Sequence, residues 1–103
     1  MEQVALHTRL KEGREADYEQ IHATIPTELD AALREAGVRG WRIWRSGRDL
    51  FHLVDVEDFE AMLDALRDHP ADVAWQHRIG ELLESPGPES GDIGGLPLIW
   101  KLP

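Results

Sequence analysis

The chain of 103 residues contains no cysteine, and that absence excludes several kinds of chemistry. Without a thiol these residues can form no disulfide, no cysteine nucleophile and no metal site that uses thiolate ligands. A domain without disulfides is typical of a reducing compartment. We therefore expect any catalysis to depend on histidine, carboxylate or hydroxyl groups.

Basic residues are also scarce, with 11 lysines and arginines against 20 acidic residues and a net charge of −9. Binding to nucleic acid needs stripes of basic side chains, and no such stripe is present. An anionic membrane surface would repel the chain for the same reason. We expect neither a nucleic acid nor a membrane as partner, whereas a neutral small molecule is compatible with this charge.

Long apolar runs are missing as well, because no stretch approaches the roughly 18 residues of a membrane-spanning helix. The first ten residues, MEQVALHTRL, lack the basic start and apolar core of a secretory signal. We expect a cytoplasmic protein. The length is typical of one domain, which we assign to residues 1–103.

Apolar residues recur with strand and helix periods in alternation along the chain. Strand-like alternation at 4–10 places Val4, Leu6, Thr8 and Leu10 on one face. A helical period over 14–36 is interrupted by Pro26, where we expect a kink or break, and Thr24 is a candidate cap for the helical segment after it. Further along we expect a hairpin of strands at 40–45 and 50–56, helices at 58–67 and 71–83, a loop at 84–95 and a last strand at 96–103. In the last of these helices the apolar stripe is expected to contain Val73, Ala74, His77, Ile79 and Leu82.

This order of elements predicts an α+β fold of the ferredoxin-like βαββαβ type. Helices cover only one face of such a sheet, so the other face needs a partner. Leu96, Leu98, Trp100 and Leu102 share one face of the predicted last strand. We expect a homodimer built on the open face, with this strand reaching toward the second copy. The alternative is that the face is covered by the chain's own loop at 84–95.

The five histidines are His7, His22, His52, His69 and His77. Their spacing matches no zinc motif, so we expect no metal site. No glycine-rich loop between strand and helix favours phosphate binding, and no serine has the surroundings of a nucleophile elbow.

Tyr18 and His22 are four positions apart in a predicted helix, so their side chains share its apolar face. Burial disfavours the charged form of a histidine and lowers its pKa from about 6.5. Such a histidine can both give and take a proton near neutral pH. The structural alternative is a core histidine that is hydrogen-bonded to a backbone carbonyl, and the two residues by themselves favour that alternative.

Four tryptophans are many for a chain of this length. Flat indole faces can stack on the C–H-rich faces of sugars. Trp41, at the start of a strand, and Trp75, early in a helix, can reach the mouth of a pocket. For Trp44 and Trp100 we expect burial in a core or a dimer interface.

Short motifs in a fixed order show that the chain resembles the L-rhamnose mutarotase family over nearly its whole length. They are RLKEG at 9–13, Tyr18 with His22, Ile25-Pro26, Glu28-Leu29, Leu33, Ala36-Gly37, Ile43 through GRDLF at 47–51, Val56 to Phe59, Pro70, Trp75 and the tail with Trp100. The resemblance implies a dimeric ferredoxin-like α/β barrel. It also implies interconversion of the α and β anomers of a pyranose, L-rhamnose or a related 6-deoxy hexose, without a cofactor.

The same resemblance implies roles for individual residues. His22 stands where the family has its acid/base, and Tyr18 and Trp41 stand at sugar-binding positions. Trp75 and Gln76 match a Trp-Trp pair that also binds sugar. Trp41 replaces a tyrosine, Gln76 replaces the second tryptophan and Ile25 replaces a tryptophan, so the pocket wall is altered while Tyr18 and His22 are kept. The alternative function, favoured by these changes, is a non-catalytic or monooxygenase-like barrel that binds a flat apolar molecule.

Overall fold

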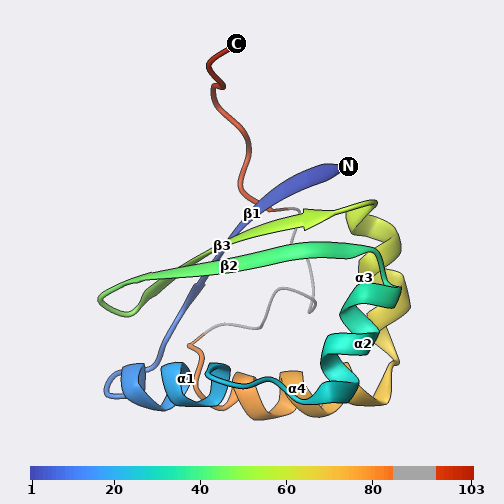
Figure 1. The fold of residues 1–103 in the computed structure, drawn as a ribbon. Helices are drawn as coiled ribbons and strands as arrows, with labels where there is room; N and C mark the ends of the chain where they lie inside the picture. Colours follow the sequence, from blue (N-terminus) through green and yellow to red (C-terminus); the bar gives the residue numbers. More distant parts are fainter. Residues whose placement is uncertain (85–94) are drawn as a thin grey trace.

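The computed structural model describes residues 1–84 and 95–103, and it confirms the predicted α+β architecture (Figure 1). Its elements are β1 Glu2–Arg9, α1 Glu15–His22, α2 Thr27–Glu35, β2 Val38–Ser46, β3 Asp49–Val56, α3 Phe59–Arg67 and α4 Pro70–Gly80. None of the helices in these ranges has the length and apolar character that crossing a membrane requires.

The three strands form one antiparallel sheet in the order β1-β3-β2, with β3 in the centre. All four helices lie on the same side of it, as Figure 1 shows. The predicted alternation is confirmed, because Leu6 and Thr8 of β1 and His52 of β3 are buried on the helix side, while His7 and Phe51 are exposed on the other. The sheet therefore has one covered face and one open face.

The prediction of a last strand at 96–103 is wrong for the single chain. Residues 95–103 have no regular structure, and Leu98 and Trp100 are 79% and 71% exposed. One backbone bond, from the Leu96 N–H to the Ala5 carbonyl at 2.6 Å, holds the start of this tail beside β1. Beyond it the tail leaves the sheet on the side away from the helices (Figure 1). Alternating apolar residues form a strand only where a second strand offers its hydrogen-bonding groups.

The expected break at Pro26 is confirmed, because α1 ends at His22 and α2 begins at Thr27. Proline has no N–H to continue a helix, but its carbonyl starts the next one by accepting bonds from the N–H groups of Leu29 and Asp30. Thr24 does not cap this helix, since Pro26 occupies the N-cap position. The break lets α1 and α2 run in different directions below the sheet (Figure 1).

Two groups of buried side chains fill the space between sheet and helices. The first joins the sheet to α3 and contains Leu6, Val54, Val56, Met62 and Leu66 among its members. The second joins the sheet to α1 and α4 and contains Leu10, Tyr18, Leu29, Leu50, Trp75, Ile79, Leu82 and Leu83. Of the functional residues predicted from the sequence, Tyr18 and Trp75 belong to this second group, whereas Trp41 packs against the first.

The buried face of α4 differs from the predicted one. Val73 is 50% exposed and His77 is also exposed, whereas Asp72, Trp75 and Ile79 are buried. Positions 72, 75 and 79 are spaced by three and four, which is the period of one helix face. The true face therefore contains a carboxylate, and this explains why the apolar residues of this helix are only roughly in phase.

Asp58 caps α3, because its Oδ1 accepts a hydrogen bond from the Ala61 N–H at 3.1 Å. We predict that Asp58→Ala lowers the free energy of unfolding by about 1 kcal/mol in a urea titration. Asp64→Ala is the control, because Asp64 is exposed in the same helix and, within residues 1–84 and 95–103, pairs only with Arg67. Its effect should stay within about 0.5 kcal/mol. Equal losses in the two variants would show that the cap contributes nothing.

Candidate active site

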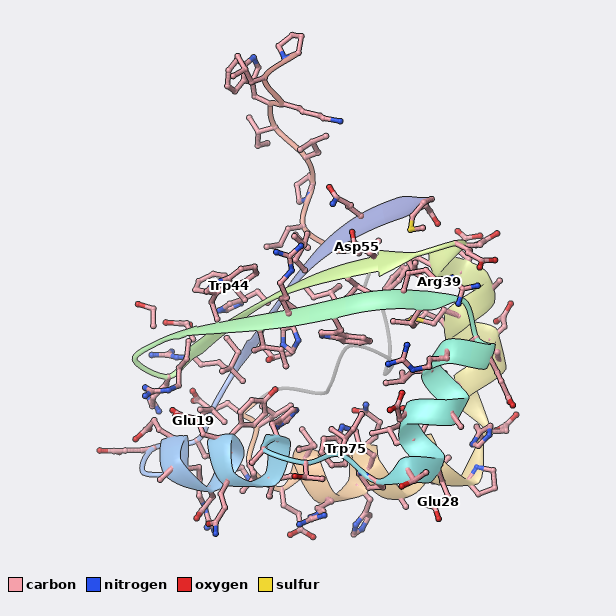
Figure 2. The ribbon with its side chains drawn as sticks, viewed as in Figure 1. Glu19, Glu28, Arg39, Trp44, Asp55 and Trp75 are labelled. Atoms are coloured by element: carbon pink, nitrogen blue, oxygen red, sulfur yellow. The ribbon has the colours of Figure 1, made fainter. Side chains whose placement is uncertain are left out.

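A cavity of ≈ 350 Å³ lies between the helix side of the sheet and helices α1, α2 and α4. All five residues predicted to form the site line it: Tyr18, His22, Trp41, Trp75 and Gln76. They come from α1, β2 and α4, and the fold brings them together. Figure 2 shows Trp75 on α4, below the sheet. Their chemical roles remain predictions, whereas their shared location is an observation.

His22 lies in the last turn of α1, where its Nδ1 is 3.0 Å from the carbonyl oxygen of Tyr18. A carbonyl can only accept a hydrogen bond, so Nδ1 carries the proton and Nε2 of the neutral ring carries the lone pair. The backbone contact expected of a structural histidine is thus present. The same contact also orients the ring and leaves Nε2 able to accept a proton.

Aromatic rings enclose His22 on two sides. The Tyr18 ring lies 4.1 Å from it between centroids, and the Trp75 ring meets it edge-on at 5.0 Å. Burial lowers the pKa of His22 below its ordinary value of 6.5, while the bond to the Tyr18 carbonyl opposes this shift. The neutral imidazole therefore predominates at neutral pH, which is the form that a general base requires.

A chain of hydrogen bonds crosses the three strands on the cavity side. The Trp41 indole N–H donates to Nδ1 of His52 at 3.1 Å, and Nε2 of His52 is 3.0 Å from the Thr8 hydroxyl. An indole nitrogen is only a donor, so Nδ1 of His52 must carry a lone pair and Nε2–H must donate to Thr8. The N–H of Trp41, which replaces the family's tyrosine hydroxyl, is therefore already engaged within the protein.

Burial lowers the pKa of His52 to about 4, and the charges of His22 and His7 add to this effect. His52 is consequently neutral at physiological pH, with both ring nitrogens hydrogen-bonded. A histidine in this condition holds its neighbours in place and is poorly suited to proton transfer.

Asp72 and Gln76 form the polar part of α4 that faces the cavity. The Asp72 side chain is buried and accepts a hydrogen bond from the Gln76 amide. Burial raises the pKa of Asp72, while Gln76 and the nearby His69 hold it down. Asp72 lies one helical turn before Trp75 and Gln76, so it shares their side of α4.

Sequence reasoning missed three polar residues of this cavity, namely Thr8, His52 and Asp72. Signals for all three were present, and the alternation of β1 already assigns Thr8 to the face of Leu6 and Leu10. His52 alternates with Leu50 and Val54 in its strand, which assigns it to the buried face. Asp72 precedes Trp75 by three positions, which places both on one helix face. Among residues 1–84 and 95–103, no three histidine or acidic side chains are grouped so that they could hold a metal ion.

Comparison with known protein sequences identifies L-rhamnose mutarotases as relatives. The sequence model of the L-rhamnose mutarotase family matches residues 3–102. The chain is 30% identical to an L-rhamnose mutarotase of Acidiphilium cryptum strain JF-5 over the full length of both proteins. It is 31% identical to an L-rhamnose mutarotase of Sinorhizobium medicae strain WSM419, with 82% of this chain and 83% of that protein aligned.

Solved structures show the same fold. An L-rhamnose mutarotase from Formosa agariphila superposes with a TM-score of 0.80 at 18% identity, with both chains fully covered. Tetracenomycin F2 cyclase from Streptomyces glaucescens, a type II polyketide cyclase, superposes with a TM-score of 0.61 at 20% identity, again over both full chains. At these identities the likeness concerns the fold alone.

The low pKa of His52 predicts a pH-dependent stability. Between pH 6.5 and about 4 the unfolded chain binds a proton that the folded chain does not, so stability falls as the pH falls through this window. We predict that the wild type loses roughly 2–3 kcal/mol more than His52→Gln between pH 7 and 4.5, measured by urea unfolding. His77→Gln is the control at an exposed histidine and should behave like the wild type. Parallel pH curves for wild type and His52→Gln would contradict the burial of a neutral His52.

Proposed function

This chain belongs to the L-rhamnose mutarotase family, and we propose that its cavity interconverts the α and β anomers of a pyranose, L-rhamnose or a related hexose, with His22 as acid/base. Mutarotases are carbohydrate isomerases, and the chain is an enzyme of this class. The observation that carries the assignment of His22 is its geometry. It lines the cavity with Nδ1 committed to a backbone carbonyl and Nε2 left with a lone pair.

Mutarotation needs one proton removed and one supplied. In the proposed reaction Nε2 of His22 takes the proton of the anomeric hydroxyl as the C1–O5 bond breaks, and water protonates the ring oxygen. The open-chain aldehyde then rotates about C1–C2. On closure from the other face of the carbonyl, O5 gives its proton back to the hydroxide as the O5–C1 bond forms, and protonated His22 gives its proton to the carbonyl oxygen, which yields the other anomer. A positioned acid/base contributes about 10²–10⁴-fold to such a step.

The aromatic residues of the cavity suit a sugar in different ways. Tyr18 and Trp75 pack against the His22 ring, so a pyranose that contacts them lies beside the proposed base. Trp41 offers its indole face, because its N–H is occupied by His52. In the proposed complex Trp41 therefore stacks on the sugar and does not donate a hydrogen bond to it.

The alternative of a non-catalytic or monooxygenase-like protein is not favoured. This alternative was suggested by the altered pocket wall at Ile25, Trp41 and Gln76. The polyketide cyclase shares the fold at 20% identity. The family model that matches residues 3–102 is that of the L-rhamnose mutarotases, and the relative aligned over the full length is also an L-rhamnose mutarotase. The cavity also keeps Tyr18 and His22 in contact.

The expected homodimer remains part of this proposal, with residues 1–103 as one domain and a cytoplasmic location. Two features support it. The open sheet face carries exposed Phe51 and Trp44, and Figure 2 shows Trp44 on the side away from the helices. The tail also exposes Leu96, Leu98, Ile99, Trp100 and Leu102. In a two-fold dimer each copy would cover the open face of the other and give the tail a partner.

We predict that His22→Ala slows anomer exchange of L-rhamnose by about 100-fold or more, measured by saturation-transfer NMR. His22→Asn is a sharper variant, because its amide N–H can still reach the Tyr18 carbonyl while the second ring nitrogen is missing. Both variants should keep the wild-type circular dichroism spectrum, and His77→Ala should keep the wild-type rate. The wild-type rate should also fall at acidic pH below 6.5, because the pKa of His22 is lowered. A folded His22→Asn variant with normal exchange would remove His22 from the mechanism.

Analytical ultracentrifugation at micromolar concentration tests the dimer. We predict a species of twice the 11.7 kDa chain mass. Deletion of residues 96–103 should weaken association sharply, whereas Val73→Ser, which changes an exposed apolar residue of the helix layer, should leave it unchanged. A stable 11.7 kDa species of the intact chain would refute the dimer.

A further inference from the structure

We infer that Asp72 is a specificity-determining residue that accepts a hydrogen bond from one hydroxyl of the sugar, with Gln76 orienting its carboxylate. The inference deepens the proposed function and rests on it. It predicts that the enzyme prefers a pyranose that carries this hydroxyl over the matching deoxy sugar. The argument depends on why a carboxylate is buried at this position.

Asp72 is 3% exposed and lines the cavity. Within the described residues it forms no ion pair with a lysine or arginine, and its direct partner is the Gln76 amide. Burying a carboxylate costs free energy unless its oxygens are hydrogen-bonded. Two carboxylate oxygens offer about four acceptor sites, whereas one amide group has only two N–H donors. Acceptor capacity therefore remains, and the cavity is the place where a ligand can use it.

Stabilisation of α4 does not explain the burial of Asp72. An acidic residue in the first turn of a helix interacts favourably with the helix dipole, but it does so from the surface as well. The first-turn acids Glu28 of α2 and Glu60 of α3 are exposed. The start of α4 is also capped already, since the Ala71 N–H donates to Nδ1 of His69. A surface acid would have served the helix equally well.

The rest of the cavity makes Asp72 the acceptor best suited to a hydroxyl. The Trp41 N–H and both ring nitrogens of His52 are already engaged across the sheet, and Nε2 of His22 is assigned to the anomeric hydroxyl in the proposed reaction. Around them the lining is largely aliphatic, including Ile25, Leu29, Leu33, Ile43, Ile79 and Leu83. A sugar hydroxyl is both donor and acceptor, so it can donate to Asp72 and accept from the Gln76 amide at once. Asp72 and Gln76 together therefore form a two-point site for one hydroxyl.

The test is a binding comparison over L-mannose and its 2-, 3-, 4- and 6-deoxy analogues, of which the 6-deoxy analogue is L-rhamnose. Dissociation constants are measured by NMR titration for the wild type, Asp72→Ala and the isosteric Asp72→Asn. Glu28→Gln is the matched control, because Glu28 is an exposed first-turn acid on α2. The wild type should bind L-mannose about 10- to 100-fold more tightly than one of the analogues, the range expected for a hydrogen bond to a charged group.

Asp72→Ala should lose the same factor for L-mannose and nothing for that one analogue, because the two changes remove the same contact. Asp72→Asn should weaken L-mannose binding as well, and Glu28→Gln should not. The inference is overturned if Asp72→Ala weakens all five sugars equally or none of them, if the wild type binds no sugar, or if neither Asp72 variant folds.

Anomer exchange measured on the same samples separates this inference from the proposed function. Selective loss of binding in Asp72→Ala together with wild-type exchange supports both. Selective loss of binding without any exchange in the wild type would refute the mutarotase and leave Asp72 as a hydroxyl-binding residue. Wild-type exchange without selective loss would support the mutarotase and refute the role of Asp72.

Discussion

Polar groups buried beneath the sheet need hydrogen-bond partners, because the helices take much of that face out of contact with water. This constraint explains the arrangement of the cavity. His22 donates to a carbonyl of its own helix, and His52 is held between an indole N–H and a hydroxyl. Each bond fixes a tautomer and a ring orientation. The bond of His22 leaves a lone pair for chemistry, whereas the bonds of His52 use both of its nitrogens. The hydrogen-bond partners of the two histidines therefore determine which of them has a ring nitrogen available to accept a proton.

The same need for hydrogen-bond partners explains the residues at positions 41 and 76, which differ from those implied by the family resemblance. An indole at position 41 brings an N–H that needs an acceptor, and His52 provides it across the hairpin. Gln76 lies beside Asp72 and donates to it. The aromatic wall implied by the family resemblance has become more polar at α4 while Tyr18 and His22 keep their contact. We therefore propose a changed substrate preference with His22 kept as the acid/base.

The open face of the sheet is the second consequence of helices that cover one side only. Trp44, Phe51 and the apolar tail are exposed there in the single chain. The tail is bonded to β1 only at Leu96. Its alternating pattern is typical of a strand, and a strand requires a neighbour that the single chain does not provide. A second copy of the chain that supplied this neighbouring strand would allow the tail to form the strand that its alternating sequence predicts.

The sequence by itself determined the elements whose signals are local. The alternation of β1, the break at Pro26, the hairpin and the pairing of Tyr18 with His22 all follow from periods of two and of three to four residues. Those signals also singled out Tyr18, His22, Trp41 and Trp75, whereas Gln76 was named only through the family resemblance. They did not suffice for Asp72, because an acidic residue in a first helical turn is ordinarily exposed, and Val73 and His77 suggested another face for α4.

Only the tertiary structure decided which polar residues share the cavity and which proton each of them holds. Thr8, Trp41 and His52 come from three different strands. Their hydrogen bonds depend on the strand order β1-β3-β2 and on the register in which β1 and β2 pair with β3. The pKa of about 4 for His52 results from burial by elements distant in the chain. Whether residues 96–103 form a strand likewise depends on a neighbouring strand with which they can pair. Periodicity assigns a side chain to a face, but desolvation and hydrogen bonding depend on what packs against that face.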